Sequence, residues 1–130
     1  MIIALNKERQ RLHIENADSS VECFCPCCGE RLVQHKGQIR RHHFAHYPGS
    51  ACSDSWEGQY DMSDWHLDWQ NRFPKGNQEV LLALGEIRHR ADVLIGRTVV
   101  EFQRSNLSAK AFQDRNSFYT NLGYKVIWVF

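Results

Sequence analysis

The sequence has 130 residues, of which 42% are hydrophobic, 12% aromatic and 24% charged, so it contains enough apolar material for a folded core and wholesale disorder is excluded. Its apolar runs are far shorter than the ~20 residues that cross a bilayer, and we expect no membrane association. Lys and Arg number 16 against 15 Asp and Glu, a net charge of +1, which excludes binding driven by overall positive charge.

The five cysteines lie at positions 23, 25, 27, 28 and 52. An odd count, with four of them crowded into six residues, argues against a disulfide framework. The chain also reaches charged residues too soon after Met1 for a secretory signal. We therefore expect reduced thiols, a cytoplasmic protein and cysteines that are available to a metal ion.

A zinc site is predicted from two pairs of metal-binding residues. Cys25 and Cys28 form a C-x2-C knuckle closed by a glycine, and His43 and His46 repeat the same spacing. Together they supply the four nitrogen and sulfur ligands of a structural tetrahedral zinc, with Cys52 as an alternative ligand. Residues 23–52 contain few large apolar side chains, so we expect the ion to stabilise this segment. The simpler alternative is a group of reduced cysteines beside solvent-facing histidines.

The remaining elements are predicted in chain order from hydrophobic spacing and turn residues. A short strand is expected over 11–15, and the spacing of Met62, Trp65, Trp69 and Phe73 predicts a helix over 55–73. Three strands follow over 78–84, 87–95 and 98–103, then a helix after the N-cap Ser108, and a last strand over 125–130. The expected fold is α/β, with an α-β-β-β-α-β core over 53–130 and a small zinc-binding module over 1–52.

Three acids fall into register across the predicted sheet. If Gly96-Arg97 and Gly85-Glu86 are two-residue turns, Asp92 lies opposite Glu101 and Glu79 lies opposite Asp92. Directly opposed Cβ atoms are about 4.5–5.5 Å apart, a spacing at which like charges repel. A row of three carboxylates therefore predicts a divalent ion such as Mg²⁺ or Mn²⁺. The alternative is an exposed sheet face whose acids are balanced by neighbouring arginines.

The sequence resembles the nuclease domain of competence protein CoiA-like proteins, members of the PD-(D/E)XK superfamily with an α-β-β-β-α-β core. The resemblance is carried by Arg90-Ala91-Asp92-Val93-Leu94, by Val100-Glu101-Phe102-Gln103-Arg104-Ser105, and by Cys25-Pro26-Cys27-Cys28-Gly29 with His43-Phe44-Ala45-His46. It extends to Trp65-His66 with Trp69, to Arg115 followed by Tyr119, and to Ile127-Trp128-Val129.

This resemblance implies metal-dependent hydrolysis of nucleic-acid phosphodiester bonds, with DNA as the expected substrate. Asp92 and Glu101 match the two acidic motif positions and would hold Mg²⁺ or Mn²⁺, with Glu79 as an additional ligand. Gln103 stands where the superfamily usually has lysine and would orient the attacking water. An amide cannot supply the positive charge of that lysine.

Other residues receive roles in this hypothesis from their positions and charges. His66 could act as a general base, a metal ligand or a phosphate donor, or it could simply pack between tryptophans. The residues expected to contact the nucleic-acid backbone are the basic side chains of the zinc module and two residues of the second helix: Arg31, Lys36, Arg40, Arg41, Arg115 and Tyr119.

Two other functions remain compatible with the sequence. One is a non-catalytic, zinc-containing DNA-binding module on a degenerate nuclease fold, which the glutamine at position 103 favours. The other is a regulatory zinc domain that binds protein and has no role with nucleic acid.

Overall fold

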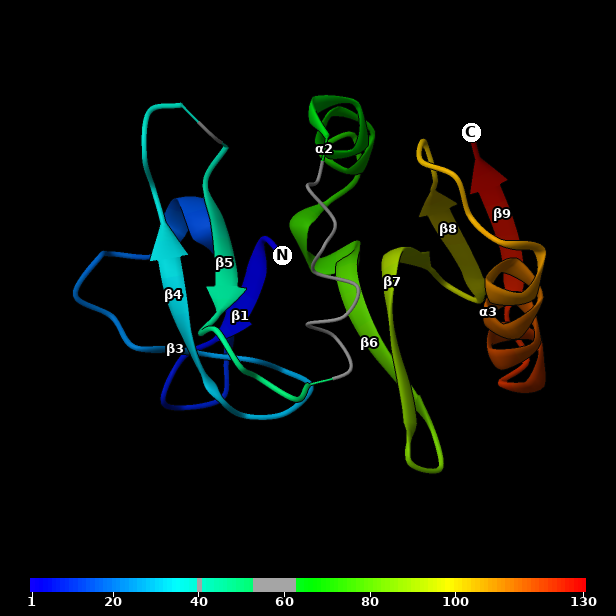
Figure 1. The fold of residues 1–130 in the computed structure, drawn as a ribbon, viewed down its shortest axis with the longest axis horizontal. Coiled ribbons are helices and arrows are strands. Elements are labelled where there is room, and N and C mark those ends of the chain that lie inside the picture. Colours follow the sequence, from blue (N-terminus) through cyan, green and yellow to red (C-terminus); the bar gives the residue numbers. More distant parts are fainter. Residues whose placement is uncertain (40, 53–62) are drawn as a thin grey trace. The chain divides into compact units, whose positions relative to one another are not determined.

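A computed structural model describes residues 1–39, 41–52 and 63–130. The chain divides into two compact units, Met1–Met62 (the N-terminal unit) and Ser63–Phe130 (the C-terminal unit), each with its own sheet (Figure 1). The expected module boundary, after residue 52, borders the segment 53–62, which lies outside the described residues. In the described part of the chain, no helix has the length and apolar character needed to cross a membrane.

The N-terminal unit contains a five-stranded antiparallel sheet in the order β2-β1-β3-β4-β5. Its strands are β1 (Ile3–Leu5), β2 (Arg11–His13), β3 (Cys23–Phe24), β4 (Arg31–His35) and β5 (His43–His46), and a 3-10 turn, η1 (Ile14–Asn16), follows β2. The predicted strand over 11–15 is therefore shorter than expected, because its last two residues enter that turn.

Most of this sheet was not predicted, because its strands are only two to five residues long and too short for a clear alternation. Residues far apart in the sequence nevertheless form a small core, in which Ile3, Ile14, Leu32 and Phe44 are all buried. The unit therefore has apolar packing of its own in addition to its cysteines and histidines.

The C-terminal unit confirms the predicted fold class, with the element order α-β-β-β-α-β. Its elements are α2 (Asp64–Gln70), the 3-10 turn η2 (Lys75–Asn77), β6 (Gln78–Leu84), β7 (Ile87–Ile95), β8 (Thr98–Phe102), α3 (Ala109–Asn121) and β9 (Lys125–Val129). The sheet order is β6-β7-β8-β9, and β9 runs parallel to β8 after the crossover through α3.

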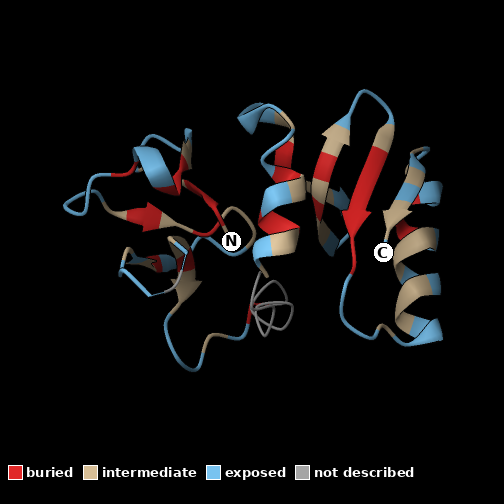
Figure 2. Cartoon of the chain, turned by 90° about the horizontal axis from the view of Figure 1, so that it is seen from above, coloured by how far each residue is buried: buried red, intermediate tan, exposed pale blue. Residues whose placement is uncertain are grey.

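The two helices of this unit cover opposite faces of its sheet (Figure 1). Val99 packs with Phe118 of α3, whereas the next residue, Val100, belongs to the cluster that contacts Trp65 and Trp69 of α2. Successive strand residues point to opposite faces, which explains this division. Four of the five residues of β8 are buried between the two layers (Figure 2).

Helix α2 is shorter than the predicted helix over 55–73. Residues 53–62 lie outside the described residues, and the described helix begins after Ser63, whose hydroxyl oxygen accepts a hydrogen bond from the His66 amide at 3.3 Å. It ends at Gln70, three residues earlier than expected, because the amides of Arg72 and Phe73 bond to carbonyls only three residues back and tighten the chain before Pro74.

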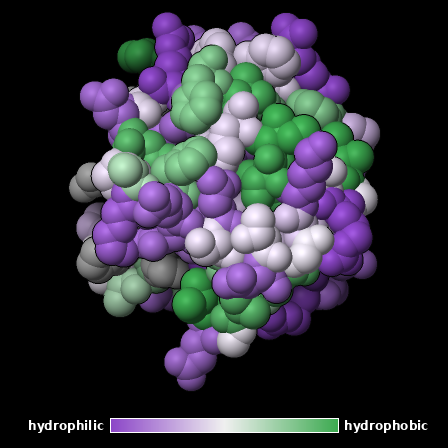
Figure 3. All heavy atoms as spheres, turned by 90° about the vertical axis from the view of Figure 1, so that its right-hand side faces the viewer, coloured by the Kyte–Doolittle hydropathy of each residue, from purple (hydrophilic) through white to green (hydrophobic). Residues whose placement is uncertain are grey.

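Strand β9 forms an edge of the C-terminal sheet and is flanked by α3. Ile127 and Phe130 are exposed there, and Trp128 stacks on Phe130. On the side of the molecule that carries α3 and β9, hydrophobic and hydrophilic surface interleave (Figure 3).

Candidate metal centre and candidate active site

A cysteine and histidine cluster in the N-terminal unit can hold a metal ion such as zinc. The ligand atoms of Cys25, Cys28, His46 and Cys52 all lie within 4.8 Å of one another. These residues come from the knuckle after β3, from the end of β5 and from the segment after it. Tertiary folding therefore brings together ligands that are up to 27 residues apart.

The distances within the cluster suit tetrahedral zinc. Bonds of about 2.3 Å to sulfur and about 2.0–2.1 Å to nitrogen place two sulfurs about 3.8 Å apart, and a sulfur and a nitrogen about 3.6 Å apart. The Cys25 and Cys52 sulfurs are 4.0 Å apart, and Cys28 Sγ lies 3.6 Å from His46 Nε2. All five cysteines are free thiols, so the donor set of three sulfurs and one imidazole fits zinc in both chemistry and size.

The backbone of the knuckle is arranged around its sulfurs. The Cys27 amide donates to Cys25 Sγ at 3.3 Å, and the Glu30 amide donates to Cys28 Sγ at 3.4 Å. Gly29 has a φ of +76°, a conformation that favours glycine and returns the chain into β4. Cys28 is exposed, yet partial desolvation of its sulfur raises the pKa of the thiol, and a bound cation would favour the thiolate instead.

The cluster differs from the first expectation in one member, since it contains Cys52, the predicted alternative, and does not contain His43. His43 and His46 are three residues apart in β5, and residues three apart in a strand point to opposite faces. The His43 ring stacks instead on His35, with ring centroids 4.9 Å apart. The x2 spacing brings two ligands together in a knuckle but separates them in a strand.

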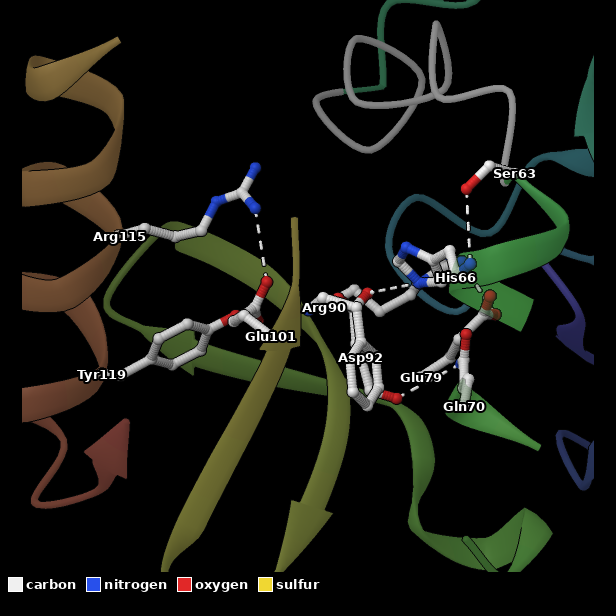
Figure 4. A network of polar contacts seen from close by, with 10 residues as sticks. Ser63, His66, Gln70, Glu79, Arg90, Asp92, Glu101, Arg115 and Tyr119 are labelled. Atoms are coloured by element: carbon white, nitrogen blue, oxygen red, sulfur yellow. Dashed lines mark hydrogen bonds and ion pairs between the residues drawn. The ribbon is translucent and has the colours of Figure 1, made fainter. Parts of the chain in front are cut away.

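In the C-terminal unit, Asp92 bridges the strands and α2. Its Oδ2 accepts a hydrogen bond from the Phe102 amide of β8 at 2.8 Å, and its Oδ1 lies 3.3 Å from His66 Nε2 (Figure 4). The side chain of Gln70 donates to the Asp92 carbonyl at 3.2 Å. Helix α2 is thereby attached to β7 at the residue that matches the first acidic motif.

Glu101 points toward α3 and is almost completely buried (Figure 4). The Tyr119 hydroxyl donates to its Oε1 at 2.6 Å, and Arg115 NH1 lies 3.3 Å from its Oε2. Burial, and then the charge of Glu101, raise the pKa of Tyr119, so its hydroxyl remains a donor. Tyr119 is 0% exposed, which corrects the expectation that it contacts phosphate; it holds Glu101 instead.

Glu79 is held by an arginine of the neighbouring strand. Its Oε2 lies 3.3 Å from Arg90 NH1, and both side chains are buried. Its φ of +46° is unusual for a residue other than glycine, and such strain is often found at functional sites. Arg90 was not among the predicted site residues. Its position on β7, two residues before Asp92, could have indicated that it lies at the site.

The three acids do not form the continuous row that the register predicted. The β7–β8 pairing is as expected from Ile95↔Thr98 to Val93↔Val100 but does not continue to Asp92 and Glu101, because the Asp92 carboxylate takes the Phe102 amide. Between β6 and β7 the predicted register is kept, because the pairs Gln78↔Val93 and Val80↔Ala91 flank Glu79 and place it opposite Asp92. Glu79 itself leaves the extended conformation there, with a φ of +46°. Among the described residues, these acids do not form a three-ligand group like that of the cysteines.

His66 lies in the core rather than at the surface. Burial alone lowers the pKa of its imidazole, but the hydrogen bond and charge of Asp92, together with the charge of Glu79, outweigh this effect and raise the pKa. Its ring also meets Phe102 edge-on, with centroids 5.7 Å apart. His66 is therefore placed to hold the Asp92 carboxylate.

Gln70 and Gln103 are also buried in the C-terminal unit. Gln103 is buried, and its amide nitrogen donates to the carbonyl and to the hydroxyl of Ser105 at 2.8 and 2.9 Å. Gln70, which was not among the predicted site residues, is fully buried beneath His66 and Asp92. Its position one helical turn after His66 is the signal that could have indicated it.

The predicted nucleic-acid contacts are distributed unevenly. Arg31 lies 3.2 Å from Glu22, and Lys36 donates to the Ala17 carbonyl. Arg41 is exposed, while Arg40 lies outside the described residues. Arg115 is mostly buried against Glu101, with 14% of its side chain exposed. The basic stretch therefore presents less uncommitted charge than its sequence indicates.

Comparison with known protein families covers both units. Residues 6–55 match "Competence protein CoiA, N-terminal domain", and residues 58–130 match "Competence protein CoiA, nuclease-like domain". No curated protein and no solved structure gave a match. Because the nuclease-like match alone covers more than half of the chain, the protein belongs to the competence protein CoiA family.

Proposed function

We propose that the C-terminal unit hydrolyses phosphodiester bonds of nucleic acid, with DNA as the expected substrate. The single observation that carries this proposal is the pair of carboxylates, the partly buried Asp92 and the buried Glu101, on adjacent strands of a nuclease-like domain. Buried carboxylates are costly unless they are paired or used. Each of these two faces a different helix and is held at both of its oxygens.

Asp92, Glu101 and Glu79 offer the hard oxygen ligands that Mg²⁺ or Mn²⁺ prefers, so the donor set fits such an ion in its chemistry. When bound, the ion would polarise a phosphoryl oxygen and lower the pKa of an attacking water. Hydrolysis forms a bond from that water to phosphorus, breaks one phosphodiester bond and leaves a hydroxyl and a phosphate end.

The protein's own residues supply orientation and charge in this proposal. His66 and the Phe102 amide hold the two oxygens of Asp92. Tyr119 and Arg115 hold those of Glu101, and the exposed part of Arg115 is available to a phosphate group. Gln103, held by Ser105, would direct the attacking water through its amide oxygen.

In the N-terminal unit, we propose a structural zinc ion held by Cys25, Cys28, His46 and Cys52, because all four positions of a tetrahedral site are then filled by protein. Three reduced thiols at one site also suit the reducing conditions of the cytoplasm, where we place the protein.

The experiment uses the full chain with its zinc bound. Plasmid and single-stranded DNA are incubated with Mg²⁺, with Mn²⁺, or with neither, and zinc content is measured after each incubation. We expect cleavage only with Mg²⁺ or Mn²⁺ and loss of cleavage in Asp92→Asn. Asp114→Asn is the matched control, since Asp114 lies exposed on α3 and pairs with Lys110.

A second function is favoured by one observation: each of the three acids already has a basic partner, and a domain that has lost its catalytic ion would keep these pairs. In that case the protein binds DNA without cutting it. Metal-independent binding with no cleavage above that of Asp92→Asn would establish this alternative.

A further inference from the structure

The β4–β5 hairpin of the N-terminal unit, whose backbone is drawn in Figure 1, has a pair of stacked histidine rings that the proposed chemistry does not use. His35 and His43 face each other in the register of the hairpin, with ring centroids 4.9 Å apart and planes inclined by 13°. His43 Nδ1 lies 2.8 Å from the Arg41 carbonyl oxygen, so this nitrogen carries a proton and donates it. The result is an ordered, flat aromatic surface.

One side of this surface is accessible. His35 is exposed and His43 is half-buried, so a third flat ring can extend the stack from the side of His35. His42, the neighbour of His43, does not take part in the stack, and its Nδ1 lies 3.2 Å from Glu15 Oε1. The hairpin therefore offers one aromatic platform and, beside it, a histidine that pairs with an acid.

The charge of the segment that contains the hairpin favours binding of an anionic polymer. Residues 31–53 contain no Asp or Glu, and Arg41 is exposed close to the histidine pair. Arg31 and Lys36, however, are engaged by Glu22 and by the Ala17 carbonyl. Phosphate contacts alone would therefore give weak binding, and stacking would add the missing affinity.

We propose that His35 and His43 form a base-stacking platform for single-stranded nucleic acid. Unpaired bases expose their faces to an aromatic ring, whereas bases inside a duplex are covered by their neighbours, so such a platform selects single strands. The inference rests on the proposed function, because it assumes a nucleic-acid substrate, and it adds the form of that substrate.

The test measures binding separately from cleavage. The full-length, zinc-loaded Asp92→Asn protein is titrated into a fluorescent single-stranded oligonucleotide and into a duplex of the same length, at several salt concentrations. We expect tighter binding of the single strand. His35→Ala should weaken that binding roughly 5- to 100-fold at an unchanged salt dependence. His35→Phe should restore it, and His42→Ala is the matched control with wild-type affinity.

A second measurement needs no substitution at the platform. A single-stranded oligonucleotide with 2-aminopurine at successive positions should lose fluorescence at the position that stacks on His35. Unchanged fluorescence at every position would overturn the proposal, as would equal affinity for single strand and duplex or wild-type affinity of His35→Ala. Cleavage of the same oligonucleotides by the unsubstituted protein tests the proposed function independently, so the two failures are distinguishable.

Discussion

The Tyr119 hydroxyl donates a 2.6 Å hydrogen bond to Glu101 Oε1, and both side chains are buried between β8 and α3. Arg115 holds the other carboxylate oxygen. The second acidic position of the nuclease-like domain is therefore supported from one helix, α3, by a donor and a cation one turn apart.

Tyr119→Phe removes that donor and leaves the ring in place. We expect the free energy of unfolding to fall by about 1.5–3 kcal/mol, because a buried carboxylate loses a hydrogen bond. Cleavage should also fall, since Glu101 would lose the donor that fixes its Oε1. Urea denaturation and the plasmid assay measure the two effects. Tyr47→Phe is the control, because Tyr47 is 52% exposed, and an equal loss in that variant would contradict the assignment.

Glu101→Gln tests whether the Glu101 carboxylate is repelled by neighbouring carboxylates or stabilised by Arg115 and Tyr119. Opposed carboxylates, as predicted from the sequence, would make the substitution stabilising. The structure reverses the sign, because Gln removes the negative charge that Arg115 and Tyr119 hold and should cost about 1–3 kcal/mol. Denaturation of the variant decides between the two, and a gain in stability would show that the acids repel each other.

Elemental analysis distinguishes which residues bind the proposed zinc ion. Cys25→Ser, Cys28→Ser and Cys52→Ser should each lower the zinc content well below one ion per chain and destabilise the N-terminal unit. His43→Ala should retain zinc, because that ring stacks on His35. Cys27→Ser is the matched control within the knuckle. A full zinc content in Cys52→Ser together with a loss in His43→Ala would reverse the assignment.

Arg97 closes the C-terminal end of α3. Its guanidinium donates to the Leu122 and Gly123 carbonyls at 3.2–3.3 Å and lies over the Tyr124 ring. We expect Arg97→Ala to lower the free energy of unfolding by about 0.5–1.5 kcal/mol, while the exposed Arg104→Ala leaves it unchanged. Thermal unfolding monitored by circular dichroism measures both variants, and identical melting curves would rule out this cap.

Gly123→Ala tests the same helix end through the backbone. Gly123 has a φ of +84°, and an added Cβ would lie 2.6 Å from Arg97 NH2. We expect a larger loss of stability than in Gly37→Ala, where no atom lies within 4 Å of the added Cβ and φ is not positive. Equal unfolding midpoints for the two variants would contradict this account.

Much of the C-terminal fold was predictable because its signals are local. Gly85 and Gly96 both have positive φ values and form the two tight turns that set the hairpin registers. Ser108 caps α3 as expected, with its hydroxyl oxygen accepting from the Ala111 amide at 3.1 Å. Turn chemistry and capping depend on neighbours in the sequence, so they can be read without knowledge of the fold.

By itself, the sequence determined the order of the C-terminal elements, the cysteine knuckle and the family resemblance, since these depend on spacing within short segments. Tertiary structure decided that Cys52 rather than His43 joins the cluster, and that His66 holds Asp92 while Tyr119 holds Glu101. These partners lie up to 27 residues apart in the sequence and on different elements. Strand direction, burial and charge compensation therefore select them from candidates that sequence spacing alone cannot distinguish.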